Sequence, residues 1–215
     1  MNLKELRRSY AQRKKGIVSR LEEFGSVLAG SRDREIFTEL SFCLFTPQSK
    51  AKSCWEAVTT LKNNKLLFDG KAPQISKHLN KVRFKNNKAR YVVEARERIS
   101  GLMDLLDGKT PGIRGPEFAV SAREWLVKNI KGIGYKEASH FLRNIGLGEH
   151  IAILDRHILK NMKALGVIKE IPAAITPKKY LEMERKLINF SKIIKIPVSH
   201  LDLLFWSNET GEIFK

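Results

Sequence analysis

The chain of 215 residues is long enough to bury a full core, either in one domain or in two closely joined lobes. Its 40 Lys and Arg residues outnumber its 23 Asp and Glu residues, which gives a formal net charge of +17. A composition that is 42% hydrophobic and 29% charged excludes a disordered basic tail. The positive excess indicates a polyanionic partner, nucleic acid before an acidic membrane surface, although some lysine-rich chains are basic only because charge keeps them soluble.

The two cysteines, Cys43 and Cys54, lack the spacing of metal ligands, and the chain has no cluster of Cys and His. We therefore expect neither a structural zinc nor an iron–sulfur cluster. The first residues are charged, and no apolar stretch approaches the length of a membrane span. This pattern predicts a cytoplasmic protein with reduced thiols and no membrane partner.

Apolar residues recur at three-to-four spacing along most of the chain, which predicts helices. In chain order the expected helices are 17–29, 34–46, 51–61, 89–106, 117–130, 135–145, 156–165, 178–194 and 198–206. The prolines fall between these ranges or in their first turns, where proline is tolerated. No segment alternates in the manner of a strand, so the predicted fold class is all-α. Two ranges are less regular, the polar segment 62–88 and the Gly/Pro-rich loop 107–116.

A basic cluster closes the first irregular range and enters the helix that follows. Five of the ten residues from 81 to 90 are basic and none is acidic: Lys81, Arg83, Lys85, Lys88 and Arg90. A solvated loop and helix start would have this composition, and so would a set of contacts to nucleic-acid phosphates. The sequence leaves both interpretations open.

A glycine turn joins the helices expected at 117–130 and 135–145. Gly132 and Gly134 flank Ile133, and the second helix begins at once. Glycine permits positive φ and close approach of the backbone, so this segment can turn sharply. The N–H groups at the start of the second helix then form an anion site that suits a DNA phosphate. A simple tight connector would look the same.

Lys136 lies in the first turn of the second helix, where it is either a surface charge or, in a desolvated pocket, a neutral amine able to act as a nucleophile. Asp155 follows nineteen residues later, after the apolar run 152–154 and before a new helix. This is the usual place of a helix N-cap. The cap is compatible with a catalytic role, because a cap fixes the orientation of the carboxylate.

The Gly-Ile-Gly-Tyr-Lys turn followed by Asp155 resembles the helix-hairpin-helix superfamily of base-excision DNA glycosylases. The words KGIGYKEASHFLRN and AILDRHIL are similar, more narrowly, to the compact second type of 8-oxoguanine DNA glycosylase/AP lyase of archaea and some thermophiles. The similarity runs from about residue 30 to the end. It implies a two-lobed helical bundle with the helix-hairpin-helix (about 117–145) at the lobe junction. One lobe would comprise 36–145, the other 1–35 with 146–215, and the active-site cleft would lie between them.

The resemblance also implies roles for individual residues. Lys136 matches the lysine that attacks C1′ of the damaged nucleotide and forms a Schiff base, and Asp155 matches the carboxylate that supports it. The matches in the base pocket are Phe84 and Trp206, which would sandwich the oxidised base, the terminal carboxylate of Lys215, and the weaker candidates Asp202 and His140. The matches in DNA binding are Gly132 and Gly134 of the hairpin, His157, Arg83, Lys85 and Gln48, which would fill the gap left by the extruded base.

The implied partner is double-stranded DNA containing 8-oxoguanine, which would place the protein at the nucleoid, with no obligate protein partner. We expect no metal or organic cofactor, apart from a structural monovalent cation that the hairpin could hold. Thr46-Pro47-Gln48 stands where the compact type has Thr-Ala-Asn, so the chain departs from the family's pattern at the residue that would fill the gap. Two alternatives stay open: the same fold acting on an oxidised pyrimidine or an alkylated base, and a helix-hairpin-helix protein that binds DNA without catalysis.

Overall fold

The computed structural model describes residues 2–30, 33–108 and 117–215, and within these ranges it contains helices and no strand. The all-α prediction is therefore confirmed. The helices are α1 (Leu3–Ala29), α2 (Asp33–Phe45), α3 (Ala51–Asn63), α4 (Leu66–Asp69), α5 (Ala72–Lys77), α6 (Lys85–Arg96), α7 (Ile99–Leu106), α8 (Phe118–Asn129), α9 (Tyr135–Asn144), α10 (Arg156–Ala164), α11 (Pro177–Ile194) and α12 (Val198–Thr210). Among the described residues, none of these helices combines the length and the apolar character needed to cross a membrane.

The observed helices depart from the predicted ranges in three places. Helix α1 begins at Leu3 rather than at residue 17, and a capping box between Asn2 and Glu5 fixes its start. The range 89–106 is divided into α6 and α7, and the segment 62–88 contains the short helices α4 and α5. Helices this short give no periodic pattern, and the charged first half of α1 buries only Leu6. Of the expected loop 107–116, residues 109–116 lie outside the described residues.

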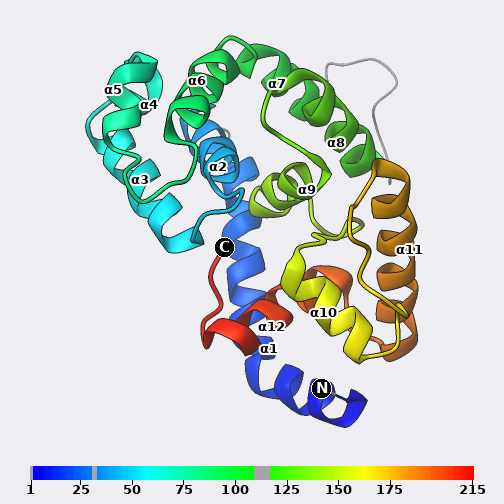
Figure 1. Cartoon of the computed structure of the whole chain (residues 1–215). Coiled ribbons are helices and arrows are strands. Elements are labelled where there is room, and N and C mark those ends of the chain that lie inside the picture. The colour runs from blue at the N-terminus through cyan, green and yellow to red at the C-terminus, as the bar shows by residue number, and fades with distance from the viewer. Residues whose placement is uncertain (1, 31–32, 109–116) are drawn as a thin grey trace.

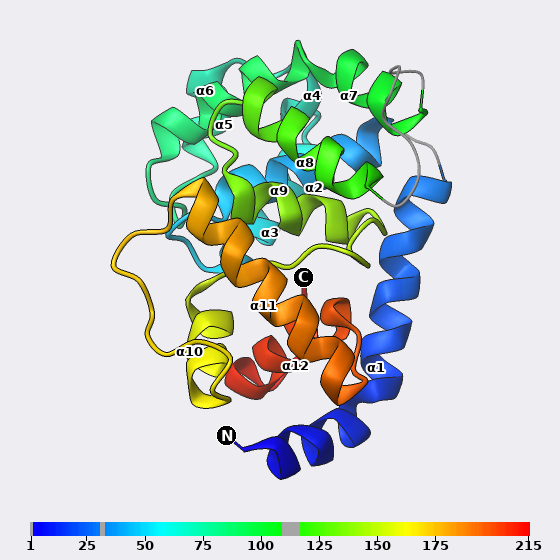
Figure 2. The same cartoon turned by 90° about the vertical axis from the view of Figure 1, so that its right-hand side faces the viewer.

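Two hydrophobic cores organise the molecule. The first joins buried side chains of α2 to α9, from Ile36 to Ile151. The second joins α1, α10, α11 and α12, with Phe205 among its fully buried members. Helix α1 runs beside both groups of helices, and the last residue of the chain lies between them (Figures 1 and 2). The lobe boundaries near residues 35 and 145 stay a prediction.

Candidate active site

The turn between α8 and α9 depends on one of its two glycines for its backbone conformation. Gly132 has a φ of +89°, and a Cβ at this position would lie 2.4 Å from Cδ2 of Tyr91. Gly134 has an extended backbone that any residue can adopt, and it caps the start of α9. Ile133 between them is buried in the first core. The turn thus anchors the start of α9, whose first N–H groups remain available to an anion.

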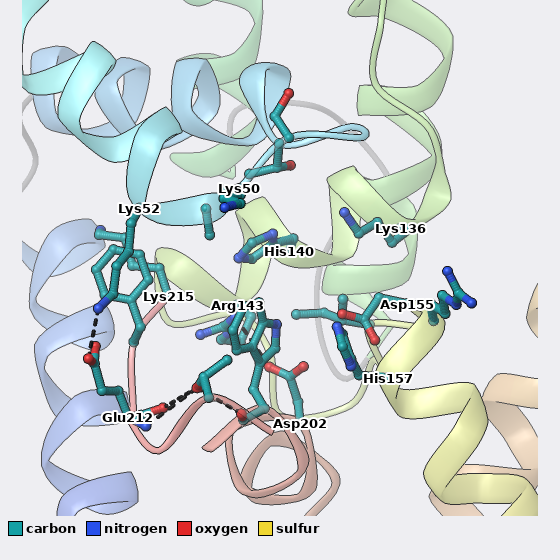
Figure 3. A pocket seen from close by; sticks show the side chains of 18 of the residues that line it. Lys50, Lys52, Lys136, His140, Arg143, Asp155, His157, Asp202, Glu212 and Lys215 are labelled. Atoms are coloured by element: carbon teal, nitrogen blue, oxygen red, sulfur yellow. Dashed lines mark hydrogen bonds and ion pairs between the residues drawn. The ribbon is translucent and has the colours of Figure 1, made fainter. Parts of the chain in front are cut away.

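A pocket of about 610 Å³ lies where the two groups of helices meet. Its walls come from the loop between α2 and α3, from α9, from the start of α10, from α12 and from the C-terminal residues. Lys136 and Asp155 both line it, on the same side (Figure 3). Sequence reasoning paired these two residues through a motif, and the structure brings both to one cavity.

Lys136 is the second residue of α9 and points into the pocket from the positive end of that helix. Its side chain is 28% exposed, so it is largely withdrawn from solvent. The amine Nζ lies 3.3 Å from Oε1 of Glu137. The geometry gives a primary amine in a concave site, which is the first requirement for Schiff-base chemistry.

Asp155 is the N-cap of α10, as its position in the sequence indicated. Its Oδ1 accepts a hydrogen bond of 2.8 Å from the main-chain N–H of Ile158. The residue's backbone is extended and its side chain lines the pocket. The cap therefore holds a carboxylate in a fixed orientation beside the space that Lys136 faces.

Asp202 and His140 form a buried polar part of the pocket wall. Burial raises the pKa of Asp202 to about 6, although Arg143, whose Nη2 lies 3.2 Å from Asp202 Oδ2, acts in the opposite direction. Burial also lowers the pKa of His140 well below its usual value, so its ring is neutral at pH 7. The His140 ring packs edge-on against Phe42, with ring centroids 5.5 Å apart. Both groups offer acceptor atoms to a ligand in the pocket.

The aromatic residues assigned to the base pocket are separated in this structure. Trp206 lines the pocket, and its ring centroid lies 5.7 Å from that of His157, which also lines it. Phe84 is 54% exposed and does not line the pocket. The guanidinium of Arg83 lies 5.6 Å from the Phe84 ring centroid. The sandwich of a base between Phe84 and Trp206 stays a prediction.

Lys215 reaches the pocket from the end of the chain. Its ammonium contacts Oε1 of Glu39 and lies 3.9 Å from the ring centroid of Trp55. Asn144 donates a hydrogen bond of 2.9 Å to the other oxygen of Glu39. These buried contacts fix the side chain of Lys215 at the junction of the two groups of helices, while the role of its terminal carboxylate stays a prediction.

Gln48 lines the pocket from the turn between α2 and α3, in a left-handed conformation with a φ of +54°. The loop is held by Lys88, whose Nζ donates to the carbonyl oxygens of Phe45 (2.7 Å) and Pro47 (2.6 Å) and to Oγ of Ser49 (3.1 Å). Burial lowers the pKa of Lys88 to about 8. Ser49 Oγ also accepts a hydrogen bond from the main-chain N–H of Arg83, which joins this loop to the basic segment.

The prediction that Lys88 belongs to a solvated or phosphate-binding cluster is wrong. Its side chain is enclosed, with the whole residue 3% exposed, because its hydrogen bonds replace water. The other members of that cluster, Lys81, Arg83, Lys85 and Arg90, are exposed. One signal in the sequence could have shown the difference: Lys88 shares a helical face with the apolar residues Val92 and Ala95.

Comparisons with known proteins agree with this geometry. Residues 17–196 match the model of a family described as 8-oxoguanine DNA glycosylase, Ogg-HhH. An 8-oxoguanine DNA glycosylase/AP lyase of Fusobacterium nucleatum is 47% identical over 98% of this chain and 96% of its own length. The enzyme of the same name from Methanocaldococcus jannaschii is 37% identical over 93% of this chain and 91% of its own length.

The solved structures that resemble this fold include 8-oxoguanine DNA glycosylases. The crystal structure of the 8-oxoguanine DNA glycosylase of Thermotoga maritima has a TM-score of 0.87 at 33% identity and covers 99% of this chain and 98% of its own. The Methanocaldococcus jannaschii glycosylase/lyase in complex with a 15mer DNA containing 8-oxoguanine has a TM-score of 0.87 at 32% identity, with 99% of both chains covered. This chain belongs to the helix-hairpin-helix family of 8-oxoguanine DNA glycosylases.

Proposed function

We propose that Lys136 and Asp155 perform the reaction of this protein, an 8-oxoguanine DNA glycosylase with AP lyase activity. The enzyme excises 8-oxoguanine from DNA and cleaves the strand at the resulting abasic site. The observation that supports these roles is the placement of the amine and the capped carboxylate on one side of the pocket at the junction of the two helix groups. The roles proposed for the other residues concern extrusion of the damaged nucleotide into this pocket and recognition of its base.

A base stacked in a duplex is out of reach of Lys136, so the nucleotide must be extruded at a cost of a few kcal/mol. Main-chain N–H groups of the hairpin, together with His157, Arg83 and Lys85, would bind phosphates and offset this cost. Gln48 would occupy the gap in the duplex. The extruded base would stack on Trp206, and base–aromatic stacking contributes about 1–3 kcal/mol. Phe84 would supply the second face of the sandwich only if its ring moves toward the pocket.

After it has lost a proton, the amine of Lys136 attacks C1′ of the damaged nucleotide as the bond from C1′ to N9 breaks, and the base leaves with the electron pair and takes up a proton. Asp155 stabilises the positive charge that develops on the sugar. The amine then loses a proton while O4′ gains one as the ring opens, which leaves an imine between Nζ and C1′. The imine acidifies the C2′ hydrogen, and its removal expels the 3′ phosphate and cuts the strand. Water releases the enzyme.

8-Oxoguanine differs from guanine in carrying a hydrogen on N7, so an acceptor aimed at N7 favours the lesion. Asp202 and neutral His140 present acceptors at the pocket, and the terminal carboxylate of Lys215 is a third candidate. Guanine has a lone pair at N7, which such an acceptor would repel. This requirement distinguishes the oxidised purine from the alternative lesions, the oxidised pyrimidines and alkylated bases.

The proposed reaction needs only the amine, the carboxylate and water, so it uses no metal or organic cofactor. A monovalent cation at the hairpin would be structural, held by main-chain carbonyl oxygens, and would take no part in the chemistry. Because the substrate is DNA, we place the enzyme in the cytoplasm, at the nucleoid. The alternative of a DNA-binding protein without catalysis does not explain a pocket that has an amine and a carboxylate in its wall.

Borohydride trapping tests the role of Lys136, because reduction of the imine leaves a stable covalent complex. The wild type should trap a duplex with 8-oxoguanine opposite cytosine, and Lys136→Gln should abolish trapping while DNA binding stays largely intact. Lys186→Gln is the matched control, since Lys186 is an exposed lysine of α11 paired with Glu182, away from the pocket. Full trapping by Lys136→Gln would overturn the assignment.

A further inference from the structure

A buried ion pair outside the pocket lining joins the two groups of helices. Arg123 of α8 donates from Nη1 to Oε1 of Glu184 in α11 (2.6 Å) and from Nη2 to Oε2 (2.8 Å). The side chains of Arg123 and Glu184 are 0% and 7% exposed, and neither lines the pocket. A buried pair of this kind is weak evidence for stability, because apolar residues of similar volume often serve as well. What the pair does supply is a fixed orientation between the groups that its two hydrogen bonds join.

Glu184 of this pair and the nearby Tyr180 also hold the segment that leads to Asp155. Glu184 Oε1 accepts a hydrogen bond of 2.8 Å from the main-chain N–H of Ala152. The hydroxyl of Tyr180 donates to the carbonyl oxygen of Ala152 (2.7 Å) and accepts from the N–H of Leu154 (3.3 Å). The backbone of 152–154 is therefore fixed at both its N–H and its C=O groups immediately before Asp155.

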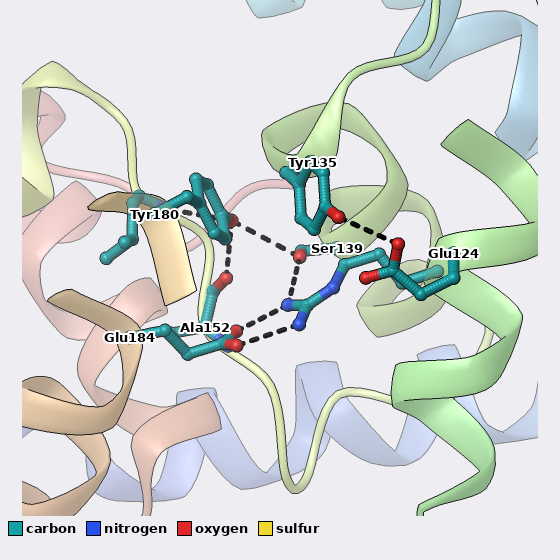
Figure 4. A network of polar contacts seen from close by, with 8 residues as sticks. Glu124, Tyr135, Ser139, Ala152, Tyr180 and Glu184 are labelled. Atoms are coloured by element: carbon teal, nitrogen blue, oxygen red, sulfur yellow. Dashed lines mark hydrogen bonds and ion pairs between the residues drawn. The ribbon is translucent and has the colours of Figure 1, made fainter. Parts of the chain in front are cut away.

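The same buried groups contact the helix that presents Lys136. Ser139 lies three residues after Lys136 in α9, and its Oγ is 3.2 Å from both Nη1 of Arg123 and the hydroxyl of Tyr180. Figure 4 shows Tyr180 and Ser139 facing each other, with Ala152 and Glu184 on one side. One polar cluster thus contacts both the helix that carries Lys136 and the segment that leads to Asp155, although Lys136 lies in α9 and Asp155 caps α10.

We propose that Tyr180, together with the pair Arg123–Glu184, is a positioning element that sets Asp155 relative to Lys136. The proposal rests on the roles assigned above to Lys136 and Asp155. Its physical basis is the steep dependence of reaction rate on alignment, since a displacement of about 1 Å can cost on the order of 100-fold in rate. Tyr180 touches no reacting atom. Its hydroxyl fixes the main chain of 152–154, and this fixes the carboxylate that follows.

The variant Tyr180→Phe tests the proposal, because it removes one hydroxyl and keeps the ring that packs against Tyr135, with centroids 5.5 Å apart. We expect the single-turnover rate of 8-oxoguanine excision at saturating enzyme to fall at least tenfold. The Kd for the lesion duplex, taken from the enzyme dependence of that rate, should stay within twofold of the wild-type value. A lower rate at an unchanged Kd would show that the hydroxyl acts on the alignment of the reacting groups and not on DNA binding.

Tyr10→Phe is the matched control. It removes a hydroxyl of α1 that lies 2.9 Å from Nδ1 of His200 in α12, a contact in which neither α9 nor the segment 152–154 takes part. Its single-turnover rate should equal that of the wild type. A rate for Tyr180→Phe within twofold of the wild type, an equal loss in both variants, or a loss explained wholly by weaker binding would each overturn the proposal.

Should Tyr180→Phe fail to fold, as judged by circular dichroism, the double variant Arg123→Met/Glu184→Leu replaces it. The double variant removes both buried charges and the acceptor for the N–H of Ala152, so it should lose at least tenfold in rate while its circular dichroism stays that of a folded helical protein; a wild-type rate would overturn the proposal. The assignment of Lys136 fails separately, through trapping of Lys136→Gln, so the two failures are distinguishable.

Discussion

Asp155 caps α10 and, in the proposed reaction, supplies a negative charge, and two substitutions separate these two properties. Asp155→Ala removes the oxygen that accepts the Ile158 N–H bond, and loss of such a cap costs about 1 kcal/mol of unfolding free energy. For a chain of this size, this corresponds to a fall in Tm of roughly 2–4 °C. Asp155→Asn keeps an acceptor oxygen and loses only the charge at the helix N-terminus, which contributes about 0.3–1 kcal/mol.

The effects of these two substitutions on the reaction should not follow their effects on stability. Both remove the charge that we propose stabilises the cationic sugar, so both should reduce the single-turnover excision rate by roughly 100-fold or more. Urea denaturation and single-turnover kinetics on the same preparations provide the two measurements. Thr176→Ala is the control, because Thr176 caps α11 through an N–H bond from Lys179 outside the pocket. It should lose stability and keep the wild-type rate. Near-wild-type excision by Asp155→Asn would refute the reasoning.

Two further predictions concern the hairpin and the pocket wall. Gly132→Ala should lose more unfolding free energy in urea than Gly166→Ala: both glycines have positive φ, but only at Gly132 would the new Cβ meet another side chain, that of Tyr91. Equal losses would contradict this. Asp202 keeps its proton up to about pH 6 when folded, because burial raises its pKa, and releases it at lower pH when unfolded. The stability it contributes is thus present below about pH 4 and lost as pH rises through 6. Asp202→Asn should flatten this dependence of unfolding free energy on pH, and parallel curves would refute the assignment.

Short-range patterns predicted most of the fold and the places of Lys136 and Asp155 in it, while the catalytic roles proposed for the two residues came from the resemblance to the helix-hairpin-helix glycosylases. The helices that pack with one apolar face, such as α9 and α10, have strong three-to-four spacing, and their starts determine where Lys136 and Asp155 lie. The cap at Asp155 was predictable because a cap is a local interaction. Helices α4 and α5 were missed because their few residues contain no full period.

The support of the site was not predictable, because it consists of contacts between residues far apart in the chain. Arg123 and Glu184 are 61 positions apart, and each alone reads as an ordinary surface charge in a helix. Glu39 and Lys215 are 176 positions apart. Charged residues are rarely buried unless they are paired, so their burial follows from the tertiary structure and not from residue type.

The two proposed catalytic groups differ in how tightly the fold holds them, and this difference indicates which one moves. Asp155 is restrained by its own cap and by the fixed main chain of residues 152–154, so its charge is in place before the substrate arrives and needs no reorganisation. Lys136 has a long side chain that is 28% exposed, and it pairs with Glu137, which is adjacent in sequence and does not tie the amine to another helix. The nucleophile can therefore swing toward C1′ while the carboxylate stays still. A network that fixes the segment before Asp155 is then more useful to the reaction than one that would restrain the amine.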